Sequence, residues 1–489
     1  WSFRESELGV DYVHEENDFV EFNREVLIPF STSTEGPGLA VGDINGDGLD
    51  DFFVGSPKWG RSGLYFQTAN GGFERIDNET MRLDSVREEI DAHIVDVNND
   101  GAKDLIIASG GNEFRLNSDN NAPVLYLNDG SGNLSRKSDA FGEVRLTAGT
   151  LQVIDFTGDG APDIFLGARA QPWAYGEIPK SYCLENDGQG NFKDVTTDWL
   201  PDEGMIGFVK GSALADINGD EKEDIVLALE WDGIKTLVNK GGKFNLTESI
   251  SGKGWWNFVE TSDIDNDGDL DLIAGNLGLN TRLKVKPGEP VRMYYNDFDD
   301  NGTKEQLLSY YVMGKEVPYN TKKEIQSQLP FVKKKFVYAS DFAEAQFADI
   351  FPVEKLDNFF EADEFRNMIF INDGRGRFEA KPLGFDAQQS TYYAARPFDA
   401  NGDELPDFLL MGNYYDANIT MGRYDNNFGT ILINRGDGEF DITQPGGDIL
   451  FGQVKNIQKI DVSGKEYWII ARNNESLKIV EFTGKNNLN

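Results

Sequence analysis

A nine-residue acidic pattern recurs along this chain and limits what the chain can fold into. The pattern reads Asp-x-(Asp/Asn/Thr)-x-(Asp/Asn)-x-x-x-(Asp/Glu), precedes an apolar segment and occurs seven times. Its copies begin at Asp43, Asp96, Asp155, Asp216, Asp263, Asp297 and Asp399. Repetition with a period of some tens of residues is typical of arrays such as solenoids and propellers.

The residues around each acidic loop predict a four-stranded unit. Short apolar segments rich in β-branched and aromatic residues flank the loop and read as strands. Further along, Asn-Asp-Gly turns and their variants, as in LYLNDGSGNL and IFINDGRGRF, are typical of tight hairpins. Four antiparallel strands recurring mostly every 47 to 61 residues describe a propeller blade.

The repeat predicts an all-β fold in which residues 1–489 form one propeller of eight blades, with seven as the alternative. The eighth unit, near residues 455–482, shows three strands, and we expect the N-terminal WSFRES to supply the fourth and close the ring. Only 34 residues separate Asp263 from Asp297, so the fifth blade should lack an outer strand.

Residues 314–365 differ from the repeats and predict a helical insertion in the sixth blade. Ile325, Leu329, Val332 and Phe336 recur at helical spacing. Lys333–Lys335 form the only basic run in the chain.

The acidic loops have the ligand types that calcium prefers. Ca²⁺ takes six to eight hard oxygens, and a nine-residue loop can supply side chains at positions 1, 3, 5 and 9 and a carbonyl at position 7. An EF-hand would instead close with Glu at position 12 between helices. We expect up to seven structural calcium ions, with loops one, two and five the strongest sites and loop four the weakest. The proposed ligands are Asp43, Asn45, Asp47, Leu49, Asp51, Asp96, Asn98, Asp100, Ala102, Asp104, Asp155, Thr157, Asp159, Ala161, Asp163, Asp216, Asn218, Asp220, Lys222, Asp224, Asp263, Asp265, Asp267, Asp269, Asp271, Asp297, Asp299, Asn301, Thr303, Glu305, Asp399, Asn401, Asp403, Leu405 and Asp407, with Asp269 supplying its carbonyl.

The formal net charge of −38 excludes nucleic acid and anionic membrane surfaces as partners, because both need basic patches. The 34 Phe, 17 Tyr and 8 Trp argue against disorder. A single cysteine excludes an intrachain disulfide, and no apolar run is long enough to span a membrane. The start at Trp1 indicates a processed or trimmed chain, so a signal or anchor would lie outside it.

No catalytic constellation emerges, and we expect no enzyme activity. His14 and His93 stand far apart without metal-ligand partners, and Cys183 lies within an apolar strand. Nucleophile elbows, phosphate loops and HExxH or CxxC motifs are absent.

The connections from strand two to strand three should gather on the face opposite the acidic loops. They are rich in aromatic residues and arginine, which are enriched at binding surfaces. The predicted partner-binding residues are Trp59, Arg115, Trp173, Trp231, Asn280, Tyr414, Tyr415 and Arg423.

The acidic loops resemble the FG-GAP/VCBS repeats of integrin α-subunits. GPGLAVGDINGDGLDDFFVG (36–55), GWWNFVETSDIDNDGDLDLIAGNLGLN (254–280), QLPFVKKKF (328–336) and ARNNESLKI (471–479) further resemble ASPIC/UnbV-associated propeller proteins of the Bacteroidota, related to cartilage acidic protein. The resemblance implies an exported, calcium-binding, non-enzymatic propeller. It would be a lipoprotein at the outer-membrane surface, acting as an accessory subunit beside SusC/SusD-type components.

Two departures from that family concern anchoring and context. The chain lacks a lipobox cysteine and an ASPIC/UnbV segment, so any lipid anchor would belong to a segment outside it.

The alternative function is a carbohydrate-binding module or a polysaccharide-degrading enzyme that recognises a glycan. Asp84-Ser85-Val86 also resembles a bacterial O-glycosylation sequon, which predicts modification of Ser85.

Overall fold

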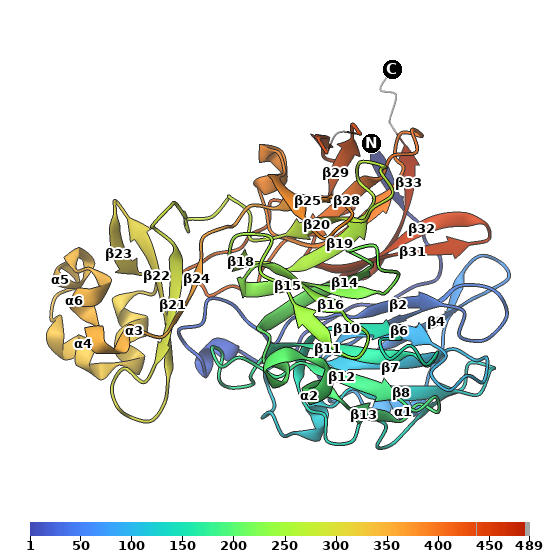
Figure 1. Cartoon of the computed structure of the whole chain (residues 1–489), viewed down its shortest axis with the longest axis horizontal. Coiled ribbons are helices and arrows are strands. Elements are labelled where there is room, and N and C mark those ends of the chain that lie inside the picture. Colours follow the sequence, from blue (N-terminus) through green and yellow to red (C-terminus); the bar gives the residue numbers. More distant parts are fainter. Residues whose placement is uncertain (437, 485–489) are drawn as a thin grey trace.

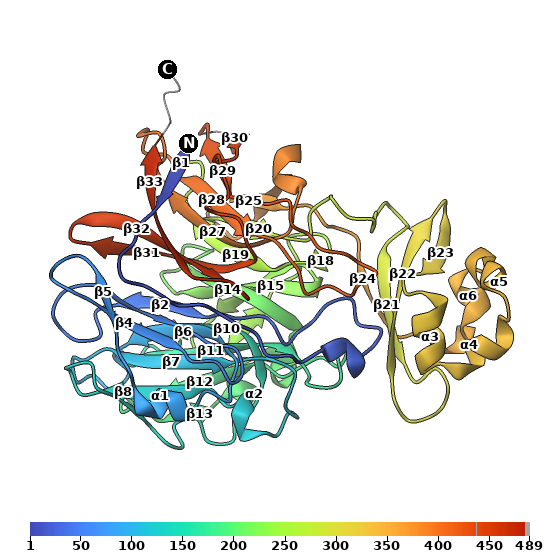
Figure 2. The same cartoon turned by 180° about the vertical axis from the view of Figure 1, so that it is seen from behind.

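The computed structural model describes residues 1–436 and 438–484. Within this part of the chain the fold is all-β and contains eight antiparallel sheets, seven of four strands and one of five. Two views show seven sheets arranged around a common centre and one, with most of the helices, standing to the side (Figures 1 and 2). No helix among the described residues is long and apolar enough to cross a membrane.

Four sheets built from consecutive strands form the first blades of the ring. Blade one contains β2 (Leu39–Gly42), β3 (Asp51–Val54), β4 (Gly63–Gln67) and β5 (Phe73–Arg75). Blade two contains β6 (Glu89–Val95), β7 (Asp104–Ser109), β8 (Val124–Asn128) and β9 (Leu134–Arg136). Blade three contains β10 (Thr147–Ile154), β11 (Asp163–Ala170), β12 (Tyr182–Asn186) and β13 (Phe192–Asp194). Blade four contains β14 (Phe208–Ala215), β15 (Asp224–Asp232), β16 (Ile234–Asn239) and β17 (Phe244–Leu246), with β18 (Gly254–Trp255) added beside β15.

The remaining blades draw on more distant segments. Blade five joins β19 (Phe258–Ser262) and β20 (Asp271–Gly275) to β25 (Met368–Asn372) and β26 (Phe378–Pro382). Blade six contains β27 (Tyr392–Phe398), β28 (Asp407–Gly412), β29 (Thr430–Asn434) and β30 (Phe440–Thr443). Blade seven contains β31 (Val454–Val462), β32 (Lys465–Arg472), β33 (Lys478–Gly484) and, as its outer strand, β1 (Ser2–Glu5).

The eighth sheet is an insertion in blade five rather than a blade of the ring. Its strands, β21 (Val291–Asn296), β22 (Glu305–Val312), β23 (Lys315–Pro318) and β24 (Phe359–Ala362), lie between β20 and β25 in the chain and pair in the order β23-β22-β21-β24. If this sheet were a blade, β21 would be its innermost strand and one edge of β21 would be free. In this sheet β24 pairs with that edge. The sheet carries α3 (Lys322–Gln328), α4 (Pro330–Lys335), α5 (Ala339–Glu344), α6 (Phe347–Ile350) and the short η4 (Val353–Lys355).

The core confirms which sheets make up the ring. Seven layers of buried apolar side chains each join two successive blades, and the last joins blade seven to blade one. Among the described residues, none of these seven layers contains a side chain from the eighth sheet. The described residues therefore form eight sheets, but the ring has seven blades, which was the alternative to the eight predicted. The outer strands that blade five seemed to lack are β25 and β26. The strand–acidic loop–strand pattern at Asp297 matches only the first half of a blade. The sequence predicted a blade there because this half resembles the start of the others.

A further core fills the face of the ring opposite the acidic loops. The N-terminal segment places Ile28 and Phe30 there, among Tyr175, Trp231 and Trp255. The Phe30 ring meets the rings of Tyr175, Trp255 and Tyr414 edge to face, with centroids 5.8, 5.3 and 6.1 Å away. We call this cluster the aromatic cap, and Val291, Met293 and Leu308 of the inserted sheet pack into it.

Short helices complete the structure outside the insertion. They are η1 (Glu21–Asn23), α1 (Glu79–Leu83), η2 (Asp119–Asn121), α2 (Thr196–Trp199), η3 (Pro201–Gly204) and η5 (Phe385–Gln388). Ser85, the predicted modification site, follows α1 and is half-buried.

Candidate functional site

Each acidic loop is shaped by the aspartate at its first position. In loop one, Asp43 Oδ1 accepts the backbone N–H of Gly46 at 2.8 Å and Oδ2 accepts that of Gly48 at 2.9 Å. The first aspartates of the other loops accept equivalent backbone N–H groups. Because these bonds curl the backbone around the carboxylate, the loops have the compact form that a nine-residue cation loop requires.

The acid at the ninth position is buried and joins three strands. Asp104 Oδ2 accepts the N–H of Val97 in its loop at 3.0 Å, and Oδ1 accepts the N–H of Asn128 at 2.8 Å. Asp51, Asp163, Asp224, Asp271 and Asp407 make the same pair of contacts, except that the loop partner of Asp163 is Thr157 and that of Asp407 is Ala400. These acids therefore hold the blade together whether or not a cation binds.

Burial perturbs the ionisation of the ninth-position acids. It raises the pKa of Asp51, Asp163 and Asp271 to about 6 and that of Glu305 to about 7, against the pull of their backbone hydrogen bonds. Neighbouring carboxylates of the same loops raise these pKa values further. A bound cation would offset both effects.

Loops five and six bring three carboxylates together closely enough to hold a metal ion. One oxygen from each of Asp263, Asp265 and Asp267 lies within 4.8 Å of the others, and so does one from each of Asp297, Asp299 and Glu305. Asp265 Oδ1 and Asp299 Oδ1 are also buried without a hydrogen-bond partner among the described residues. Of the loops expected to be the strongest calcium sites, one, two and five, only loop five brings three carboxylates together in this way among the described residues.

The third position explains this difference. It is an aspartate only in loops five and six, and in the others it is Asn45, Asn98, Thr157, Asn218 or Asn401. In loops two and seven the Asn98 and Asn401 amides donate to Asp100 and Asp403, at 2.9 and 2.7 Å. The aspartate at the third position was visible in the sequence, and it distinguishes the two loops in which three carboxylates converge from the other five.

The predicted partner-binding residues divide between the surface and the aromatic cap. Trp59 is 67% exposed, and Arg115, Asn280 and Arg423 are also exposed. Trp173 lies between the guanidinium groups of Arg24 and Arg115, each 4.8 Å from its ring centre. The half-buried Tyr415 lies under Arg423, 3.8 Å from its ring centre.

Trp231 and Tyr414 are not surface residues, and their prediction as binding residues is wrong. Their exposed fractions are 3% and 6%, and Trp231 Nε1 donates to the Tyr175 hydroxyl at 2.7 Å. They are buried because the segment around Phe30 lies over them. That segment has no strand pattern, and its apolar run VLIPF was the only sign that it packs against the ring.

Sequence reasoning also missed a buried charged cluster in the central channel beneath the cap. Arg169 donates from Nε to Glu35 at 2.8 Å and from Nη1 to Glu230 at 2.7 Å. Lys210 and Lys455 lie beside these carboxylates, at 3.8 Å from Glu230 and 3.6 Å from Glu35. These residues come from three blades and the N-terminal segment, so no local motif joins them.

Comparison with known proteins shows that the chain contains FG-GAP-like repeats. The family described as FG-GAP-like repeat matches residues 43–107, 96–166 and 216–274, which include five of the seven acidic loops. Integrin alpha-4 of Xenopus laevis is 28% identical over 145 residues, which cover 27% of this chain and 14% of the integrin.

Similar solved structures are distant. The V. cholerae biofilm matrix protein Bap1 is 11% identical, with 99% of this chain and 91% of that chain covered and a TM-score of 0.36. An ancestral GH74 enzyme is 12% identical, with 94% and 49% covered and a TM-score of 0.45.

Proposed function

We propose that this protein is a non-enzymatic, calcium-stabilised propeller that binds a protein partner through its inserted module. It would act at the outer-membrane surface, lipid-anchored through a segment outside the chain, as an accessory subunit of a SusC/SusD-type complex. The observation that carries the proposal is the inserted module, which projects from the ring and exposes apolar side chains beside a basic run (Figure 1).

Several exposed apolar residues of the module follow the end of one helix. Val337 and Tyr338 are 72% and 69% exposed and follow the exposed Lys333–Lys335 of α4 after the buried Phe336. Val353, at the start of η4, is 64% exposed. Apolar and aromatic side chains held in water beside charged ones are typical of protein-binding surfaces.

The module is well anchored for such a role. One face of its sheet packs on α3–α6 through Tyr294, Leu307 and Phe347, and the other packs into the aromatic cap. A surface displayed on a packed module loses little conformational freedom when a partner binds.

Calcium would stabilise the acidic-loop face of the ring and, at loop six, the inserted sheet. The converging carboxylates of loops five and six, with buried oxygens that lack hydrogen bonds, support this role most directly. Each of these loops supplies ligands from its own nine residues, which favours a structural ion over a catalytic one.

The titratable groups suited to catalysis are engaged or buried, which supports a non-enzymatic role. The His93 Nε2 atom lies 2.9 Å from the Leu151 carbonyl oxygen. His14 and Cys183 are 1% and 0% exposed, and burial lowers the pKa of His14 to about 3.

Purification from native membranes tests the proposal. The wild-type protein should recover β-barrel outer-membrane proteins, and the V337D/Y338D double variant should lose them. Met205→Asp, at a 50% exposed site in the connection between blades three and four, is the control and should retain them. Equal recovery with the double variant would contradict a docking role for the module, and recovery of a free protein that binds glycans would favour the alternative.

A further inference from the structure

The central channel contains a cavity of about 400 Å³ lined by the inner strands of the blades. Phe30, Trp255 and Tyr414 of the aromatic cap lie over one end, where Lys210 and Tyr393 line both the cavity and the space beneath the cap. From there the inner strands run toward the acidic loops. The cavity is thus closed at the cap and has the size of a small-molecule site.

Three cations and two carboxylates meet at the closed end. Its cations are Arg169, Lys210 and Lys455, and its carboxylates are Glu35 and Glu230. Burial alone would raise the pKa of Glu35, but Arg169, Lys210 and Lys455 hold it below its usual range. Burial lowers the pKa of Lys210 to about 8, so it remains protonated at neutral pH.

Lys455 is the cation of this cluster whose ammonium makes no hydrogen bond among the described residues. Arg169 already occupies both carboxylates, and Lys210 Nζ donates to Asn257 Oδ1 at 2.8 Å. The Lys455 side chain is only 4% exposed, and its Nζ has no hydrogen-bond partner in the described part of the chain. Its Nζ lies 3.6 Å from a Glu35 oxygen and 4.4 Å from the centre of the Tyr393 ring, and Glu16 also interacts with it electrostatically. A buried ammonium with three unused donors is costly, and an anion that accepts from it would remove this cost.

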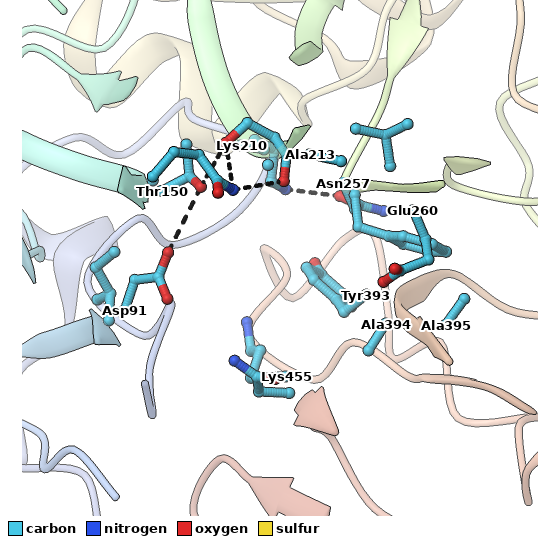
Figure 3. A pocket seen from close by; sticks show the side chains of 18 of the residues that line it. Asp91, Thr150, Lys210, Ala213, Asn257, Glu260, Tyr393, Ala394, Ala395 and Lys455 are labelled. Atoms are coloured by element: carbon cyan, nitrogen blue, oxygen red, sulfur yellow. Dashed lines mark hydrogen bonds between the residues drawn. The ribbon is translucent and has the colours of Figure 1, made fainter. Parts of the chain in front are cut away.

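The cavity walls favour a ligand that carries hydroxyl groups. Figure 3 shows Lys455 reaching toward the open centre beside Tyr393, with Asp91, Thr150 and Asn257 around it. Ser212, Gln152 and Gln458 add further hydroxyl and amide groups. Asp91 also lines the cavity and would repel a ligand with two or more negative charges, whereas Glu260 is paired with Arg396 of the same wall.

We propose that this channel binds a small polyhydroxylated monocarboxylate, a sugar acid of the uronate type, with its carboxylate on Lys455 and its hydroxyl groups on the amide and hydroxyl side chains of the wall. This function is separate from the partner-binding module and does not depend on it.

Calorimetric titration with galacturonate tests the assignment, with galactose and acetate as probes that lack the carboxylate or the hydroxyl groups. Galacturonate should bind the wild type at least about tenfold more tightly than either probe. Lys455→Met should weaken galacturonate binding by about tenfold or more. Lys459→Met, on the same strand but paired with Glu466 at 3.3 Å, should leave it unchanged.

Thermal melting shows whether Lys455→Met folds. If it does not fold, a second variant tests the proposal. Gln458→Glu adds a negative charge to the half-buried wall and should also weaken galacturonate binding. No binding of galacturonate to the wild type, equal binding of acetate, or unchanged binding in these variants would each overturn the proposal.

Discussion

At the scale of single residues, a repeated asparagine joins neighbouring blades. Asn186, at the end of β12, donates to the Val97 carbonyl of blade two at 2.9 Å and to Pro162 of its own blade at 3.1 Å. Its Oδ1 accepts the N–H groups of Gly188 and Gly190 in the hairpin turn. Asn128, Asn372 and Asn434 make the same inter-blade contacts.

Replacing one of these asparagines should therefore be costly. Asn186→Ala leaves the Val97 carbonyl and two turn N–H groups without their partner, and we expect a loss of about 2–4 kcal/mol in the free energy of unfolding. Asn191→Ala is the control, because its exposed amide bonds only within the same turn. Chemical denaturation measures both, and similar small losses would contradict the role of the inter-blade bond.

The buried Glu89 should make stability depend on pH. Burial raises its pKa to about 7, against hydrogen bonds from Ser62 and Ser56. Between its ordinary pKa of about 4.3 and about 7, the folded state binds more protons than the unfolded state, so stability falls as pH rises through this window.

Glu89→Gln removes this titration, and its stability should fall less steeply across the window, by about 3 kcal/mol at most. Melting curves at several pH values measure the slope. Glu74→Gln, at an exposed position of β5, should keep the wild-type slope. A variant slope as steep as that of the wild type would show that other buried acids dominate.

At the scale of elements, the acidic loop combines a backbone turn with a cluster of charge. The turn is fixed by the first and ninth acids, whereas the third decides how many carboxylates converge. Loops five and six should therefore respond most to removal of calcium.

We expect chelation to lower the melting temperature by several degrees, because an ion that binds only the folded state stabilises it. Asp265→Ala combined with Asp299→Ala should reduce the increase that added calcium produces. Asp269→Ala is the matched control, since it removes a charge from loop five without removing a proposed side-chain ligand. An identical response to calcium in the double variant would exclude these loops as sites.

At the scale of the whole molecule, the ring closes through strands from both ends of the chain. β1 pairs with β33, and Phe3 packs against Trp468 and Phe482 with ring centroids 6.2 and 5.2 Å away. The strands β1 and β33 lie side by side in both views of the fold (Figures 1 and 2).

This closure predicts a large effect for one N-terminal residue. Phe3→Ala should lower the free energy of unfolding by about 3–5 kcal/mol, because it leaves a cavity between blades six and seven. Arg4→Ala, whose side chain is 67% exposed, should change it little. Thermal or denaturant unfolding distinguishes them, and equal effects would mean that β1 contributes little to closure.

The sequence by itself determined the repeating unit, because alternating strands, acidic loops and Asn-Asp-Gly turns are local patterns whose chemistry acts over a few residues. It therefore predicted a propeller of four-stranded antiparallel units, with eight blades or seven, and the acidic loops that begin at Asp263 and Asp297. Only the tertiary structure decided that β25 and β26 return to β20 after the insertion, which leaves seven blades in the ring. It also decided that Phe30 buries Trp231 and Tyr414, and that Lys455 faces a cavity beside Arg169. These contacts join residues far apart in the chain. A local sequence pattern predicts only nearby structure, so it does not show which distant residues pair or become buried together.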